Sequence, residues 1–239
     1  MPTISDAVRR MVSARYFSFQ FTAEFHEASE RFGCVMTSGG RVDILTRNLA
    51  ATSTMRFLGA VAPDELIHGR VIVYGGRLFQ RLDQPGADDW MEFADTGRGW
   101  LNELLPLCLL EVADPQSSLA PEGVTIIDVP VARIPDDIFS VINGEVSSAE
   151  AYFVNPIGTI HLEVSCTEGA LAACDVSLPC TDGVADRVSL RLTPVPAFDV
   201  APPAAIAHRF ADIGDFAANV VEDPHTVGST GLSRPADPT

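Results

Sequence analysis

The residues best suited to chemistry are gathered between His161 and Cys180. The H-L-E triplet at His161, followed by the P-C pair that ends at Cys180, imitates part of the zinc deaminase signature H-x-E…P-C-x-x-C. Gly183 stands where that signature needs its last cysteine, and the H-L-E triplet alternates as a strand does. A deaminase site is therefore not expected here.

Three of the five cysteines, Cys166, Cys174 and Cys180, fall in the same region. Thiolates with His161 would suit zinc, but the spacing C-x7-C-x5-C matches no common zinc knuckle. The odd total excludes complete internal pairing. The three leave room for one disulfide in an exported protein, whereas free thiols in a loop are expected in a cytoplasmic one. We expect neither a metal nor a cofactor, and a zinc enzyme at this cluster is kept as an alternative.

The rest of the predicted fold is organised around the stretch from Tyr16 to His26. Its residues alternate strictly, with one side apolar and the other polar, which predicts a strand with one buried face. The apolar side carries Phe17, Phe19, Phe21, Ala23 and Phe25. These include four of the thirteen phenylalanines, and a helix, a second sheet or a ligand must cover them. An aromatic stripe usually packs in a core. Four large rings, however, need a large space between the strand and the element that covers it, and part of that space could be an apolar ligand cavity.

Two helices are predicted around this strand. The first spans Thr3–Ala14, where Thr3 and Asp6 resemble a capping box with Asp as a weaker partner than Glu, and the second spans Gly99–Leu110. Pro106 predicts a break or kink in the second helix. Further strands are predicted at Gly33–Thr37, Arg41–Arg47, Leu49–Phe57, Leu66–Tyr74, Arg77–Leu82, Val124–Val131, Ala151–Val154, Thr159–Cys166 and Val188–Leu192.

Glycine- and proline-containing turns connect these strands. Hairpins are expected at Ser38-Gly39-Gly40, at Gly75-Gly76 and at Asn155-Pro156-Ile157-Gly158. Pro194 and Pro196 interrupt the late strand, so its far end should lie at a sheet edge. The prediction is one α+β domain over residues 1–216. A disordered tail is expected over residues 217–239, which are polar and rich in proline, glycine and serine.

The net charge of the chain limits the classes of molecule that it is expected to bind. The chain has 239 residues, 46% of them hydrophobic, and a net charge of −16. Such an acidic protein repels phosphate backbones, so nucleic-acid binding is not expected. No run approaches the roughly 18 apolar residues of a membrane span. The first twelve residues lack the apolar core of a secretory signal, so we expect either a cytoplasmic protein or one whose signal was removed.

The order of several motifs resembles a known family. S-F-Q-F-T at Ser18–Thr22, G-R-V-D at Gly40–Asp43, a hairpin and loop over Gly69–Trp90, and a closing strand that runs from Val188 into Pro202-Pro203 follow one another. Together they resemble the actinobacterial LppX/LprG-type lipoproteins, whose fold is similar to that of the LolA lipoprotein carriers. The likeness covers roughly Asp6 to Pro203 and depends on motif order more than on any single motif.

The resemblance implies a strongly curved antiparallel sheet, a LolA-like half-barrel wrapped over a few helices. It also implies a non-enzymatic protein that binds or transports a lipid or acylated molecule, and it suggests the cell envelope as location. The residues expected to line the apolar cavity are Phe17, Phe19, Phe21, Phe25, Met55, Phe57, Tyr74 and Trp100. The alternative is a sensor or protein-interaction domain whose core is filled by its own side chains.

Overall fold

The structure is a computed structural model, and its described part consists of eight segments. These are residues 2–26, 33–58, 66–83, 89–94, 101–120, 123–135, 158–179 and 185–211. The element order is α1 (Ile4–Ala14), β1 (Tyr16–His26), β2 (Gly33–Asp43), β3 (Asn48–Leu58), β4 (Leu66–Tyr74), β5 (Arg77–Leu82), β6 (Met91–Phe93), α2 (Leu101–Val112), β7 (Gly123–Pro130), the 3-10 turn η1 (Val131–Arg133), β8 (Thr159–Thr167), β9 (Ala170–Pro179), β10 (Ala185–Pro194) and β11 (His208–Phe210).

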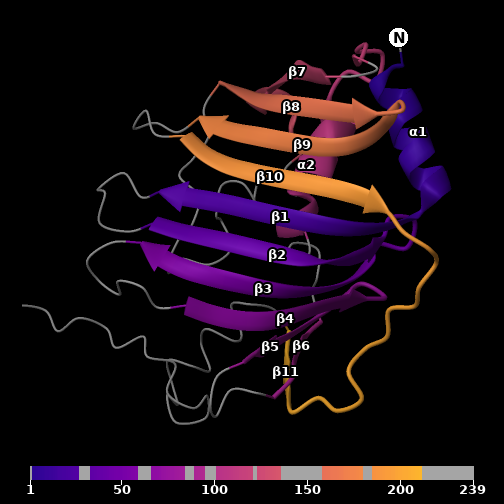
Figure 1. Cartoon of the computed structure of the whole chain (residues 1–239). Coiled ribbons are helices and arrows are strands. Elements are labelled where there is room, and N and C mark those ends of the chain that lie inside the picture. The colour runs from indigo at the N-terminus through magenta and orange to yellow at the C-terminus, as the bar shows by residue number, and fades with distance from the viewer. Residues whose placement is uncertain are drawn as a thin grey trace, which may run out of the picture.

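All eleven described strands belong to one open sheet in the order β11-β6-β5-β4-β3-β2-β1-β10-β9-β8-β7 (Figure 1). Each neighbouring pair is antiparallel except β11 and β6, which are parallel. The prediction of an α+β fold built on a large, mainly antiparallel sheet is confirmed. β1 has the predicted bounds and lies near the centre, between β2 and β10.

The first helix is fixed at its start by the predicted capping box. The Asp6 carboxylate accepts from the backbone N–H of Thr3 at 3.1 Å, and the Thr3 hydroxyl accepts from the N–H of Asp6 at 3.2 Å. The helix then buries Ile4, Ala7 and Met11. It packs against β9, so it covers one end of the sheet (Figure 1).

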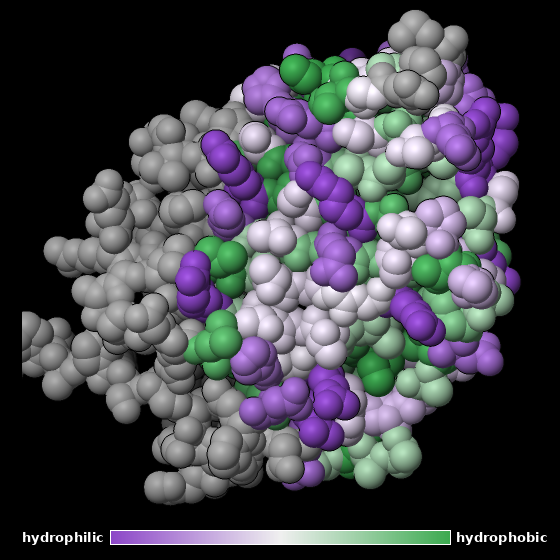
Figure 2. Space-filling view, in the orientation of Figure 1, coloured by the Kyte–Doolittle hydropathy of each residue, from purple (hydrophilic) through white to green (hydrophobic). Residues whose placement is uncertain are grey.

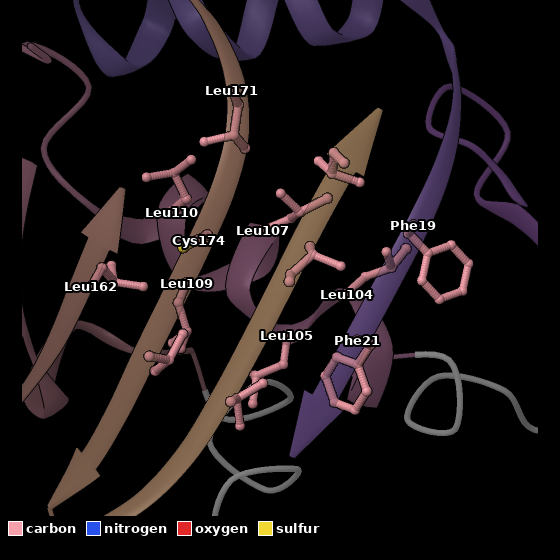
Figure 3. Packing of buried hydrophobic residues seen from close by; sticks show 14 of the residues in the cluster. Phe19, Phe21, Leu104, Leu105, Leu107, Leu109, Leu110, Leu162, Leu171 and Cys174 are labelled. Atoms are coloured by element: carbon pink, nitrogen blue, oxygen red, sulfur yellow. The ribbon is translucent and has the colours of Figure 1, made fainter. Parts of the chain in front are cut away.

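The second helix lies across the face of the sheet that carries the phenylalanine stripe, against β9 and β10 (Figures 1 and 3). We call this the inner face, and the opposite one the outer face. One helix runs through Pro106, so the expected break into two pieces is not seen. Every residue from Glu103 to Leu110 is buried. Packing on all sides therefore holds the helix despite the hydrogen bond that proline cannot donate.

Two predicted boundaries are wrong because tertiary pairing overrides local signals. The strand β2 runs straight through Gly39 and Gly40, and the chain turns after Asp43 instead. The strand β10 is an interior strand, and Pro194 is its last residue, opposite Phe17. The turn at Gly75-Gly76 is confirmed: both glycines have positive φ, of 58° and 77°.

The outer face is mostly polar (Figure 2). Ser189, Thr22, Thr37 and Thr54 lie side by side in one row across four strands. On this face Figure 2 shows pale, weakly polar surface with hydrophilic groups scattered over it. The polar half of the alternation in β1 is thus explained by solvent.

Candidate functional site

Small side chains gather on the inner face where β2, β3 and β4 meet. Phe21 lies opposite Ser38, Ser38 opposite Ser53, and Ser53 opposite Gly69. The next row pairs Phe19 with Gly40, Gly40 with Ala51, and Ala51 with Val71. We call the following five residues the small-residue track: Ser38, Gly40, Ala51, Ser53 and Gly69.

The glycine in the middle of this track brings two backbones unusually close. A Cβ on Gly40 would lie 2.1 Å from the carbonyl oxygen of Ala50 and 2.7 Å from the Cα of Ala51. No real side chain fits at such distances, so only glycine serves here. Gly39 and Gly40 pair with β1 on one side and β3 on the other, so they belong to a strand, and the close approach of β3 explains why position 40 is glycine.

The track is sealed at one end and accessible at the other. At the sealed end, Val42 and Leu49 have no exposed surface. At the other end Met36 lies opposite Met55, and Met55 lies opposite Ile67. All three are partly exposed, and both methionines pack against the core. Methionine is flexible and polarizable, which suits a surface that must adapt to an apolar partner.

One acid is buried against this track. Glu103, in the first turn of α2, is 4% exposed, and Ser38 is 3% exposed. Burial raises the pKa of Glu103 to about 7, although hydrogen bonds from its own backbone and from Ser38 oppose the shift. When the Ser38 hydroxyl donates instead to the carbonyl of Thr52, at 3.4 Å, its oxygen is left to accept a hydrogen bond from neutral Glu103.

The predicted phenylalanines are packed inside the core. Phe17 and Phe19 are 1% exposed and Phe21 is 2% exposed. They belong to the same buried cluster as the leucines of α2, which Figure 3 shows beside Phe19, Phe21 and the residues of β8 and β9. These rings are therefore enclosed by protein atoms.

The other predicted residues divide into three groups. Met55 lies on the inner face, at its accessible end. Tyr74 is 40% exposed on the outer face, because alternation in β4 turns Val71 and Val73 inward; its assignment to the cavity is wrong. Trp100 lies outside the described residues, as do the side chains of Phe25 and Phe57.

The thiols do not form a reactive site. Cys166 and Cys174 are free and buried, and Cys174 belongs to β9, where a loop was expected. Burial raises the pKa of Cys174 to about 12 and that of Cys166 above its ordinary value. Both are protonated at neutral pH and are poor nucleophiles. The Cys174 thiol instead donates to the carbonyl oxygen of Pro106 at 3.8 Å and links β9 to α2.

The residues weighed as zinc ligands lie on opposite faces of the sheet. His161 and Glu163 are exposed on the outer face of β8, whereas Cys166 and Cys174 are buried on the inner side. Cys180 lies outside the described residues, as does the predicted tail 217–239. Among the residues the structure describes, no three His, Cys, Asp or Glu side chains are grouped as metal ligands. His161 pairs instead with Asp128, Nδ1 to Oδ1 at 2.6 Å.

A small cavity of about 160 Å³ lies away from the phenylalanine stripe, along β7 and the segment after α2. In the described part of the chain, neither helix is long and apolar enough to span a bilayer. Comparison with known proteins finds no matching family model and no matching curated protein. The resemblance to the LppX/LprG-type lipoproteins therefore stays a prediction.

Proposed function

We propose that the chain binds the apolar part of a lipid or acylated molecule on the inner face, between the small-residue track and α2. The observation that carries this is the accessible end of that face. There Met36, Met55 and Ile67 expose apolar surface that continues into the track. A LolA-like half-barrel, as the sequence resemblance implies, would place its ligand between sheet and helix in the same way.

The second helix supports the proposal because it breaks two local rules. Pro106 in a helix interior costs about 3 kcal/mol or more. Glu103 is an acid in a buried position, and burial raises its pKa to about 7. Folds usually break local rules at functional sites and compensate elsewhere. A helix held by apolar packing against strands β9 and β10 is the natural element for a ligand to displace.

A second candidate, a domain with a filled core and no ligand, is favoured by the burial of Phe17, Phe19 and Phe21. Organic extraction of the purified protein followed by mass spectrometry separates the two functions. A carrier releases a lipid in constant proportion to protein, and a filled domain releases none.

A matched pair of variants tests the location. Ser53→Leu places a large side chain on the inner face within the track, whereas Thr52→Leu places the same side chain on the outer face of the same strand. We expect Ser53→Leu to weaken uptake of a fluorescent fatty acid about tenfold or more, and Thr52→Leu to leave it unchanged. Equal uptake by both variants, with both folded by circular dichroism, would place the ligand elsewhere; no uptake by the parent would favour the filled domain.

A further inference from the structure

The strand β7 ends the sheet on one side. It pairs with β8 from Gly123 to Pro130, and no other strand adjoins it in the part of the chain that the structure describes. In Figure 1 it lies at the edge of the sheet, above β8. An open edge of this kind is a template for another extended segment, because its backbone donors and acceptors are free on one side.

The direction of the free groups follows from the register. The N–H of Val131 donates to the carbonyl of Gly158 at 2.9 Å, and these two residues continue the register of β7 with β8. Hydrogen-bonded and non-bonded pairs alternate along an antiparallel ladder. Val124, Ile126 and Asp128 therefore direct their N–H and C=O groups away from β8, toward the open side.

Among the described residues, this edge has little of the usual protection against pairing. Val124 is 58% exposed and Ile126 is 68% exposed, and Figure 2 shows hydrophobic surface at this end of the sheet. Protective lysines are common on edge strands, but β7 carries no basic residue, and all sixteen basic residues of the chain are arginines. Along β7 only Pro130, the last residue of the strand, lacks a backbone N–H to donate.

The small cavity runs beside the same edge. Its volume of about 160 Å³ is well below the roughly 300–1,000 Å³ of small-molecule sites, so it suits a single side chain. Its walls come from β7 and from the segment that follows α2, including Asp114 and Ser117. A strand laid along β7 would hold one of its apolar side chains above this space.

The acidic charge around the cavity indicates which kind of segment would bind beside β7. Asp114 and Asp128 line the cavity against a single cation, Arg133, and the Asp128 side chain is 64% exposed. His161 contacts Asp128 and neutralises it when protonated. The whole chain carries a net charge of −16, which attracts cations at long range. A second copy would bring the same acidic charge and, paired about Ile126, would set Asp128 opposite Val124.

We propose that the open edge of β7 binds an extended, basic peptide segment of a partner protein. The segment adds to the sheet as a further strand beside Val124, Ile126 and Asp128. It places an apolar side chain in the adjoining cavity and a basic one near Asp114 and Asp128. Backbone hydrogen bonds supply the affinity and alternate side chains the specificity. This site is independent of the inner face.

The probe is a short synthetic peptide of alternating valine and lysine with a fluorescent label. Its control is the same peptide with alternate backbone amides N-methylated, which keeps the charge and removes the donors. We expect saturable binding by fluorescence anisotropy that weakens with salt and falls tenfold or more for the methylated peptide. Equal binding of the two peptides would show adsorption by charge alone and overturn the proposal, as would no binding at low salt.

Two substitutions that each add one positive charge test whether the peptide binds at the edge of β7. Ile126→Arg blocks the exposed edge, and Thr37→Arg adds the same charge to the exposed face of an interior strand. We expect only the first to lower binding tenfold or more. Carbodiimide coupling gives a second readout: since the chain has no lysine, lysine–carboxylate crosslinks come from the peptide and should map to Asp114 or Asp128. Crosslinks spread over other acids, or a parent dimer that Ile126→Arg dissociates, would refute a basic peptide partner.

Discussion

The most informative perturbation is Glu103→Gln, which replaces the buried acid with a neutral amide of the same shape. Glutamine can donate to the Ser38 oxygen or accept from its hydroxyl, as protonated glutamate can, so the contact between Glu103 in α2 and Ser38 in β2 can be kept. The substitution removes only the ability to carry a charge. Its effect on stability should therefore depend on pH, and the sign of that dependence follows from the direction of the pKa shift.

Burial raises the pKa of Glu103 from 4.5 in a solvated chain to about 7 in the folded protein. Between these values the unfolded chain has lost the proton and the folded protein has kept it. The unfolding free energy of the parent therefore falls as the pH rises through this window and levels off above it. Because each tenfold change in proton affinity corresponds to about 1.4 kcal/mol, the loss amounts to about 3 kcal/mol.

Urea unfolding followed by circular dichroism, repeated from about pH 4 to about pH 8, measures this effect. We expect the free-energy difference between Glu103→Gln and the parent to grow by about 3 kcal/mol in favour of the variant across that range. The control is Glu111→Gln, on an exposed position of the same helix, which should show no such growth. Parallel pH curves for Glu103→Gln and the parent would show that Glu103 is not held neutral by burial, and the argument about α2 would fail.

Two further substitutions test the frame around the site. Phe21→Ala should lower the unfolding free energy by about 3–5 kcal/mol, since Phe21 is 2% exposed and a void would remain; Tyr74→Ala on the outer face is the control, and a small loss at Phe21 would contradict the packed core. Asp43 accepts from Arg15 at 2.7 Å and from the N–H of Leu45 at 3.0 Å, so Asp43→Asn should cost about 2 kcal/mol at neutral pH. The hydrogen bond from Arg15 lowers the pKa of Asp43 below 3.8. The unfolding free energy of the parent therefore falls as the pH drops through the lowered pKa, and Asp43→Asn should make this fall at acid pH smaller. An unchanged fall in acid titration would contradict the pairing.

Much of the fold could be predicted because its signals are local. Alternation alone gives the bounds of β1, and Thr3 with Asp6 gives the start of α1. The partner of β1 on its other side, β10, could not be predicted, because it lies far away in the sequence and nothing local marks it as an interior strand. The turn misplaced at Gly39-Gly40 has the same cause: the contact that needs glycine is with the backbone of the next strand.

The candidate site was found only in part. The inner face of β1 follows from its sequence, but Tyr74 was misplaced although alternation beside Val71 and Val73 already turns it outward. Glu103 was missed altogether. A signal was present, because a single acid within L-N-E-L-L-P-L-C-L-L has no polar helix face to lie on. The track next to it emerges only from the register of β2, β3 and β4, which no single segment contains.

The sheet is open between β7 and β11, and this gives it a mechanical property that a closed barrel lacks. Neighbouring strands tolerate twist angles from about −10° to −35° without losing their ladder. A change of a few degrees at each junction of an eleven-stranded sheet adds up to a large displacement of its two ends. If the inner face binds a ligand as proposed, small changes in twist would let it accept ligands of different thickness at almost constant hydrogen bonding, with the strain spread over the whole sheet.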